Sequence, residues 1–216
     1  GLPDVFSPEA RHEAGLCPRR VTPAEHSATH TDISSLPIVT IDGETARDFD
    51  DAVSVTKENG LYRLTVAIAD VAHYVRPGTA LDREAYERGT SVYFPDRAIP
   101  MLPHELSDGI CSLNPQADRL AQTAVLDIDR KGEIIRADFF RAVIRSRARM
   151  TYTEVRRILV DRDPECLVRY VDLVDQFKLM EELALILQEQ RRGRGNLDFD
   201  LPEPEIILDL QGVPEN

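Results

Sequence analysis

The sequence predicts an α+β fold in which a mixed or antiparallel β-sheet, built from hairpins, packs against helices. Two turn signals support this prediction, because Asn59-Gly60 and Lys131-Gly132 each separate two apolar segments, as in hairpins. A segment that begins at Pro164 supports the helical part, because its apolar residues recur at helical spacing. Apolar residues make up 42% of the 216 residues, which is enough for a packed core.

The chain is expected to become regular only after a loosely patterned start. Residues 1–35 are rich in Pro, His, Ser and Thr, so we expect a linker-like lead-in with one short helix near residues 8–15. The next expected elements are a buried strand at 36–41, hairpin strands at 52–56 and 61–69, a helix at 81–89, and short apolar pieces at 92–94 and 98–102.

The rest of the chain is expected to form another hairpin, two helices and a last strand. Their ranges are 122–129 and 133–145 for the hairpin, 151–160 and 164–192 for the helices, and 205–210 for the strand. Thr151 or Thr153 can cap the first helix, with Glu154 beside it, and Gly193 can end the second. The last strand is followed by a turn and needs a partner, so we expect the chain to be the first part of a larger domain.

Charge and cysteine content restrict the class of protein. The net charge of -12 argues against a protein that coats nucleic acid non-specifically, although it does not exclude a nuclease. The three cysteines lie far apart and form no CxxC, so neither a disulfide framework nor a zinc site is expected, and a cytoplasmic location is the default. We expect no signal peptide and no membrane span. His73, His104 and the N-terminal histidines are expected to be surface or core residues and not ligands.

The segment IDGETARDFDDAV holds five acidic residues within ten positions, between two predicted strands. They are Asp42, Glu44, Asp48, Asp50 and Asp51. Two carboxylates about 5 Å apart repel by roughly 3 kcal/mol at an effective dielectric constant near 20, and a divalent cation removes that cost. Magnesium prefers oxygen ligands and keeps water positions that phosphate oxygens can take. If the four aspartates converge, they can therefore bind magnesium, and two such ions can bracket a phosphodiester.

The acidic segment is also compatible with a solvated loop or with a calcium loop. A run of charge is often only solvated, and calcium loops are acidic as well. The EF-hand pattern counted from Asp48 is not met, because Val53 and Asn59 stand where Gly and Glu are needed. Phe49 favours a metal site slightly, because a buried aromatic ring between the aspartates would fix which carboxylates point inward.

Several motifs occur in a fixed order along the chain and carry a resemblance to a known family. IVTIDGETARDFDDAV is followed by LTVAIADVAHYVRPG, then RGTSVYFPDRAIPMLP, RARMTYTEVRRIL and GNLDFD. Over roughly residues 36–200 the sequence resembles the ribonuclease II/ribonuclease R family, which carries the RNB exoribonuclease catalytic domain. The RGTSVYFPDRAIPMLP segment is most similar to the bacterial ribonuclease R branch.

The resemblance implies an RNB-type nuclease domain, with its N-terminal portion at 36–216 after the lead-in at 1–35. The implied activity is that of a processive 3′–5′ exoribonuclease that depends on Mg2+, accepts Mn2+ as a substitute, and hydrolyses single-stranded RNA to nucleoside 5′-monophosphates. Flanking OB-fold RNA-binding domains and the rest of the catalytic domain are expected in the parent protein. The isolated chain is therefore expected to bind RNA weakly and to cleave it slowly or not at all.

The same resemblance implies roles for the acidic residues. Asp42, Asp48, Asp50 and Asp51 would form the catalytic, metal-binding cluster. Asp42 and Asp51 would be the principal ligands, Asp48 would contact a second ion, and Asp50 would be the carboxylate most tied to the chemical step.

Three aromatic residues would bind substrate by the same resemblance. Tyr93 would stack on a base near the 3′ end, with Phe199 as its partner, and Tyr152 would position the terminal nucleotide. Without the resemblance, packing would be the simpler interpretation of all three. Arg119 could touch phosphate or pair with Asp118 or Asp108.

A non-catalytic RNA-binding or scaffolding relative is the alternative function. Such a protein would be expected to have lost one or more of the four aspartates, and all four are present. A phosphotransferase with a DxD loop is disfavoured, because Glu44 stands two residues after Asp42.

Overall fold

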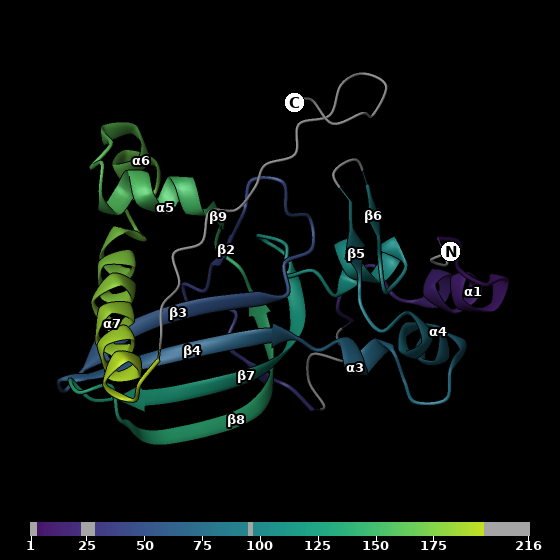
Figure 1. Cartoon of the computed structure of the whole chain (residues 1–216), viewed down its shortest axis with the longest axis horizontal. Coiled ribbons are helices and arrows are strands. Elements are labelled where there is room, and N and C mark those ends of the chain that lie inside the picture. The colour runs from purple at the N-terminus through teal and green to yellow at the C-terminus, as the bar shows by residue number, and fades with distance from the viewer. Residues whose placement is uncertain (1–3, 23–28, 95–96, 197–216) are drawn as a thin grey trace.

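The computed structural model describes residues 4–22, 29–94 and 97–196. Its main sheet consists of β1 (Thr31–Asp32), β3 (Asp51–Glu58), β4 (Leu61–Ala69), β7 (Asp118–Ile128) and β8 (Ile134–Arg145). The strand order is β1-β8-β7-β4-β3, as Figure 1 shows. β1 is parallel to β8, and the other neighbouring pairs are antiparallel. This mixed sheet confirms the predicted α+β class.

Both predicted hairpins of the main sheet are confirmed, and turn chemistry explains them. Asn59 (φ 52°) and Gly60 (φ 80°) both have positive φ, as a two-residue type I′ turn requires. In the turn between β7 and β8, the Asp129 carboxylate accepts hydrogen bonds from the backbone N–H groups of Lys131 and Glu133. Gly132 has a φ of 82° in the same turn. The β3–β4 turn fixes the strand that follows the acidic segment.

Two small sheets lie beside the main one. β2 (Thr40–Asp42) pairs in parallel with β9 (Arg149–Thr151), and β5 (Val92–Tyr93) pairs antiparallel with β6 (Ala98–Ile99). The strand expected at 36–41 is shorter than predicted, although its residues Ile38, Val39 and Thr40 are fully buried. Val39, just before β2, forms an isolated β-bridge with Val53 of β3. Because β2 itself pairs with β9, this segment connects the main sheet to the β2–β9 sheet.

Helices pack at both ends of the main sheet. They are α1 (Pro8–Leu16), α3 (Val71–Tyr74), α4 (Ala80–Arg88), the π-helical segment η1 (Glu105–Ile110), α5 (Tyr152–Leu159), α6 (Pro164–Arg169) and α7 (Val174–Gly193). α1 confirms the short helix expected in the lead-in. The Glu13 carboxylate accepts hydrogen bonds from the N–H groups of Ala80 and Leu81 at 3.0 and 2.9 Å, so α1 is tied to the start of α4.

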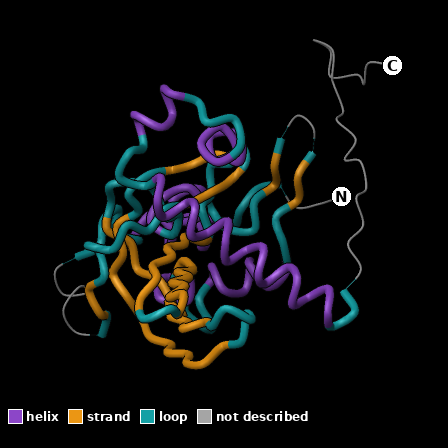
Figure 2. The backbone as a smooth tube through the Cα atoms, turned by 90° about the vertical axis from the view of Figure 1, so that its left-hand side faces the viewer, coloured by secondary structure: helices purple, strands orange, loops and turns teal. Residues whose placement is uncertain are grey.

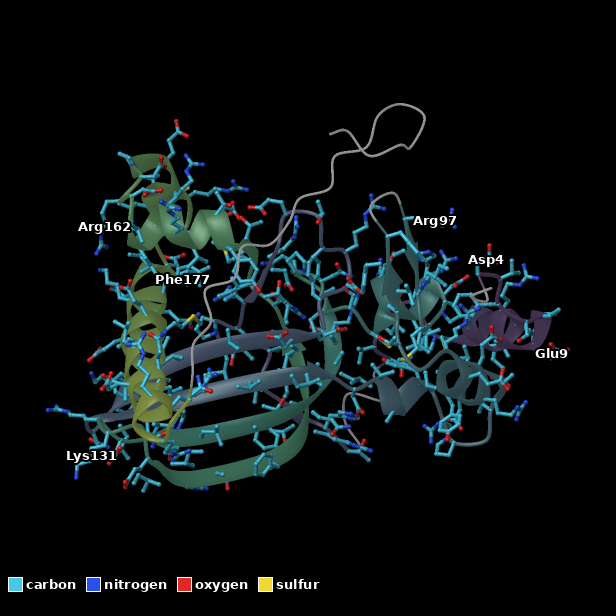
Figure 3. The ribbon with its side chains drawn as sticks, in the orientation of Figure 1. Asp4, Glu9, Arg97, Lys131, Arg162 and Phe177 are labelled. Carbon is cyan, nitrogen blue, oxygen red and sulfur yellow. The ribbon has the colours of Figure 1, made fainter. Side chains whose placement is uncertain are left out.

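The longest helix covers the end of the sheet where β3 and β4 meet. Figure 2 shows α7 crossing in front of the strands when the molecule is seen from that side. Ser54 of β3 donates a hydrogen bond to Gln176 of α7 at 2.9 Å, and Leu183 packs with buried Val55 and Tyr62. Phe177, labelled in Figure 3, is fully buried near the end of α7 that faces α5 and α6.

The single helix predicted over 164–192 is wrong, because the chain forms α6 and α7 with a turn between them. α6 ends at Tyr170, whose φ of -114° and ψ of 28° are not helical. The Tyr170 hydroxyl donates a hydrogen bond to Glu154 of α5 at 2.6 Å. Cys166 of α6, Leu173 of the turn and Phe177 of α7 pack in the same core on either side of this break. The capping box predicted for α5 is confirmed at Thr151.

Some predicted features lie outside the described residues, namely the strand at 205–210, the turn after it and Phe199. Among the helices that the structure describes, none combines the length and the apolar character needed to cross a membrane.

Candidate active site

The acidic segment connects β2 to β3 and borders a cavity of about 920 Å³. Asp42, Asp48 and Asp50 all line this space, which we call the acidic cavity. Asp42 is the last residue of β2, where it lies opposite Thr151 of β9. Asp51 is not among the lining residues and begins β3 opposite Ile68, with an exposed side chain. Three of the four predicted aspartates therefore share one cavity, and the fourth, Asp51, begins the edge strand β3 of the main sheet.

Phe49 anchors the acidic segment from within. Its side chain is only 4% exposed, which is the condition under which an aromatic residue among the aspartates would fix their directions. Its N–H donates a hydrogen bond to the Ser112 hydroxyl at 3.0 Å, and its carbonyl accepts one from Leu113 at 2.8 Å. Because the ring is held in the core, the flanking residues Asp48 and Asp50 both line the acidic cavity.

Arg149 of β9 holds the other half of the segment. Its Nη2 donates to the carbonyl oxygens of Glu44 at 2.7 Å and Gly43 at 3.1 Å, and the carbonyl of Ala46 lies at 3.4 Å. Its guanidinium lies 5.3 Å from the centre of the Phe49 ring. Charged donors make the stronger protein hydrogen bonds, so Arg149 acts as a clamp on the loop.

The carboxylates of the cavity disfavour their own ionisation. Burial and then repulsion from Asp51 raise the pKa of Asp42, although Arg149 opposes this. Burial and then repulsion from Asp48 and Asp51 raise the pKa of Asp50. Crowded carboxylates of this kind are stabilised by a nearby cation. The repulsion that the sequence analysis anticipated is therefore present.

The donor set fits a hard cation, because the predicted cluster offers only carboxylate oxygens. The oxygens do not form a closed cage, however. Among the residues that the structure describes, no three of the four aspartates place ligand oxygens within 4.8 Å of one another. The geometry instead leaves space between the carboxylates, as a site needs when it shares its ions with substrate oxygens and water.

The predicted aromatic residues differ in their positions. Tyr93 of β5 lines the acidic cavity, is 69% exposed, and donates a hydrogen bond from its hydroxyl to Asp48 at 3.2 Å. Tyr152 begins α5 and is 65% exposed, but it does not line this cavity. It directly follows Thr151, the residue of β9 that lies opposite Asp42. Both exposed rings are available for stacking, in contrast to the packing interpretation.

Sequence reasoning missed the basic residues of the cavity. Arg47 and Arg97 line it together with the aspartates, and Figure 3 shows Arg97 at the tip of the β5–β6 hairpin. Arg47 directly precedes Asp48, which was a usable signal. Arg119, in contrast, is 8% exposed and donates to the backbone carbonyls of Ser112 and Asp118, so it braces the fold.

The fold and the acidic segment together identify the family. The chain belongs to the RNB domain family, whose model matches residues 30–216. Ribonuclease R of Escherichia coli strain K12 is 47% identical over 199 residues, which cover 92% of this chain and 24% of that protein. Ribonuclease R of Thermotoga maritima is 47% identical over 212 residues, which cover 97% of this chain and 29% of that protein.

A solved structure shows the same fold. Mycoplasma genitalium RNase R, solved in complex with ribose methylated single-stranded RNA, matches with a TM-score of 0.86 and 32% sequence identity. The match covers 98% of this chain and 33% of that chain. These similarities confirm the family and the RNB-type fold that the sequence resembled. The chain spans about a quarter to a third of the length of these relatives.

Proposed function

We propose that the chain forms the acidic part of the active site of an exoribonuclease that degrades single-stranded RNA. The reaction is magnesium-dependent and processive, proceeds from the 3′ end, and releases nucleoside 5′-monophosphates in the cytoplasm. The observation that carries the proposal is that Asp42, Asp48 and Asp50 line one cavity with Tyr93, in a chain of the RNB domain family. The RNA-bound relative from Mycoplasma genitalium supports RNA as the substrate.

The four aspartates would hold the magnesium ions. Asp42 and Asp51 are assigned as principal ligands, Asp48 as a contact to a second ion, and Asp50 as the carboxylate closest to the chemical step. Bound magnesium supplies positive charge beside the scissile phosphate, where negative charge develops during hydrolysis. Mn2+ has similar oxygen preferences and is expected to substitute. The Arg149 clamp keeps the loop in place for this task.

The remaining groups of the cavity suit a nucleotide chain. Tyr93 can stack on any base, and base–aromatic stacking contributes about 1–3 kcal/mol without regard to sequence. Phe199 is assigned as its partner and Tyr152 as the residue that positions the terminal nucleotide. Arg47 and Arg97 supply positive charge at the rim, where phosphates would enter. The rest of the catalytic domain and flanking OB-fold domains of the parent protein would complete the channel.

Single-turnover decay of uniformly labelled single-stranded RNA by the parent protein tests the proposal. The variant Asp50→Asn removes one charge from the acidic cavity, and Asp138→Asn makes the same change at a half-buried site beside Arg136, outside that cavity. We expect Asp50→Asn to lose cleavage while it still binds RNA, and Asp138→Asn to retain both. Mononucleotide 5′-phosphates should be the first products of the unaltered enzyme.

Three outcomes contradict the proposal. Equal decay rates in Asp50→Asn and the unaltered protein would remove the acidic cavity from the reaction. RNA binding without any decay by the unaltered protein would favour the non-catalytic alternative. Decay that persists in chelator, without added magnesium or manganese, would exclude the metal-dependent mechanism.

A further inference from the structure

A second cluster of ligand-type side chains lies at the junction of β4 and α3. It consists of His30, just before β1, Asp70, between β4 and α3, and His73 within α3. One ligand atom from each residue lies within 4.8 Å of the other two. The side chains of His30 and Asp70 have no exposed surface, and His73 is half-buried. None of the three lines the acidic cavity.

Two buried polar atoms of this cluster face each other without a hydrogen bond. His30 Nε2 lies 3.7 Å from Asp70 Oδ2, which is too long for a hydrogen bond. Within the described ranges, neither atom has a hydrogen-bond partner. Buried polar groups are normally paired, so a pair of unsatisfied atoms at one point requires a physical cause.

The other atoms of the same two side chains are already bonded. His30 Nδ1 lies 2.9 Å from the Thr29 hydroxyl, and Asp70 Oδ1 accepts a hydrogen bond from Gln122 at 3.1 Å. These contacts resemble the outer contacts that orient metal ligands, in which the far side of each ligand is held by a hydrogen bond. They leave Nε2 and Oδ2 as the atoms that can bind an ion.

The spacing suits a small ion. Two ligands about 2.0–2.1 Å from a tetrahedral zinc ion lie roughly 3.3 Å apart, which is a few tenths of an ångström below the 3.7 Å observed between His30 and Asp70. The rings of His30 and His73 approach at 74°, with centroids 5.7 Å apart, so their nitrogens reach the site from different directions.

We propose that His30, Asp70 and His73 bind one divalent transition-metal ion, with zinc as the representative ion. Imidazole nitrogen favours zinc and its neighbours in the first transition row, whereas magnesium prefers an all-oxygen site. This ion is therefore distinct from those of the acidic cavity. It would join the segment before β1 to α3, and so fasten β1 to the edge of the main sheet.

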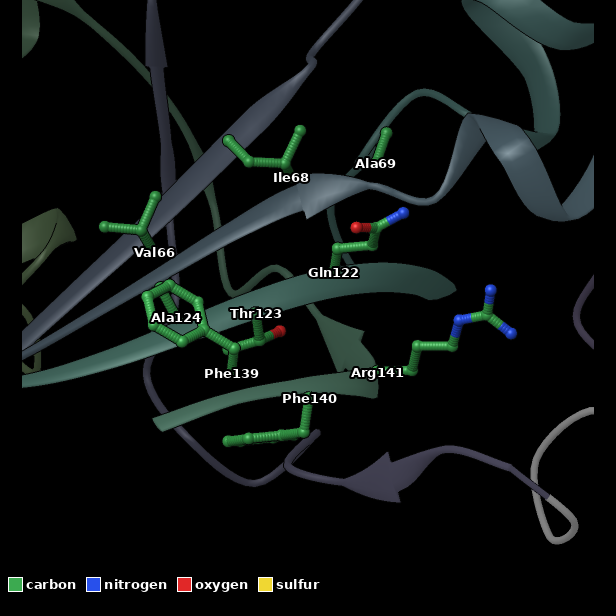
Figure 4. Close-up of a pocket in the computed structure, with 9 residues that line it drawn as sticks. All are labelled: Val66, Ile68, Ala69, Gln122, Thr123, Ala124, Phe139, Phe140 and Arg141. Atoms are coloured by element: carbon green, nitrogen blue, oxygen red, sulfur yellow. The ribbon is translucent and has the colours of Figure 1, made fainter. Parts of the chain in front are cut away.

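Arg141 is the group that competes with the ion. Its Nε lies 3.5 Å from Asp70 Oδ2, and its side chain is 51% exposed. Figure 4 shows Arg141 and Gln122 projecting from β8 and β7 beyond the pocket that they border. Because half of its side chain is in solvent, Arg141 can withdraw when a cation binds.

Zinc binding to the 216-residue chain tests the proposal. Equilibrium dialysis in excess magnesium, which fills oxygen-only sites, should leave one zinc ion per chain. The variants His30→Gln and His73→Gln should weaken zinc binding by about a hundredfold or more, since both remove a direct ligand. His12→Gln is the matched control, because it removes an exposed imidazole on α1 that belongs neither to the His30 cluster nor to the lining of the acidic cavity. Unchanged zinc binding in both ligand variants would overturn the proposal.

A second measurement does not depend on how the variants fold. X-ray absorption at the zinc edge of the unaltered chain should show nitrogen and oxygen neighbours at about 2.0–2.1 Å with imidazole scattering. An all-oxygen shell would place zinc in the acidic cavity and overturn the proposal, as would the absence of zinc after dialysis. Such an absence would identify His30 and Asp70 as an ion pair.

Discussion

The Arg149 clamp allows a quantitative prediction about the acidic loop. Arg149→Met removes the guanidinium while it keeps most of the side-chain length. The two N–H groups of Arg149 Nη2 face three carbonyl oxygens, and the oxygens of Glu44 and Gly43 are nearer than the third. The variant should leave the main sheet intact, because Arg149 belongs to the small β2–β9 sheet.

The expected magnitude follows from those two hydrogen bonds. A hydrogen bond with a charged partner contributes about 1.5–3 kcal/mol. We take about 1.5 kcal/mol for each hydrogen bond, because Glu44 is exposed and water can replace the donor. The two hydrogen bonds together then stabilise the ordered loop by about 3 kcal/mol. Since each 1.4 kcal/mol is a factor of ten, Mn2+ binding should weaken by up to about a hundredfold. Arg149 also lowers the pKa of Asp42, so the deficit should widen as the pH falls and protons compete with the ion.

Mn2+ titration followed by electron paramagnetic resonance, at several pH values, measures this effect. Hydrogen exchange of the amides in residues 43–48 reports the order of the loop in the same samples. Arg145→Met is the matched control, because Arg145 pairs with Asp118 and does not contact the acidic segment. If Arg149→Met binds Mn2+ as tightly as the unaltered chain and its loop amides exchange no faster, the clamp does not hold the loop.

Four further predictions concern stability and RNA binding. Asp50→Asn should raise the free energy of unfolding of the metal-free chain at neutral pH by less than about 1 kcal/mol. Burial and repulsion raise the pKa of Asp50, so its charged form destabilises the folded chain. This gain in stability should vanish as the pH falls through the pKa of Asp50 in the folded chain. Asp127→Asn should lower the melting temperature at neutral pH, because the hydrogen bond from Arg63 lowers the pKa of Asp127 and so favours its charged form in the folded chain. If the stability of Asp50→Asn and that of Asp127→Asn depended on pH in the same way, this account would be refuted. Tyr93→Ala should weaken single-stranded RNA binding by the parent protein roughly ten- to a hundredfold in fluorescence anisotropy, whereas Tyr93→Phe should not, and equal losses would argue against stacking. Tyr170→Phe should lower the free energy of unfolding in urea by about 1–2 kcal/mol, because it removes the hydrogen bond from Tyr170 to Glu154 of α5. An unchanged unfolding midpoint would mean that this hydrogen bond does not hold α6 against α5.

Local chemistry explains which parts of the fold were predictable. The turn at Asn59-Gly60 depends only on the two residues themselves, so both strands around it were found at nearly their observed bounds. The break at Tyr170 depends on a hydrogen bond to Glu154, sixteen residues away, and apolar spacing carries no trace of it. Periodicity therefore merged α6 and α7 into one helix.

In the candidate site, too, local sequence predicts some features and the fold alone creates others. The aspartates were found because they are dense in the sequence, whereas the burial of Phe49 was only a condition in the sequence argument and is supplied by the fold. The role of Arg149 could not be found from spacing, because it acts on carbonyl oxygens rather than on a side-chain motif. His73 stands only three residues after Asp70, but neither histidine was interpreted as a ligand, because only the fold brings His30 to them.

The parallel pairing of β2 with β9 has a consequence for how the domain folds. Arg149 reaches carbonyl oxygens that lie 103 to 106 positions earlier in the chain. Contacts between such distant positions form late, because a long loop must close before they stabilise anything. Both hairpins of the main sheet can form before this closure, since each needs only neighbouring residues. A ribosome that is still synthesising the protein therefore carries a chain whose acidic loop is unclamped until β9 has emerged.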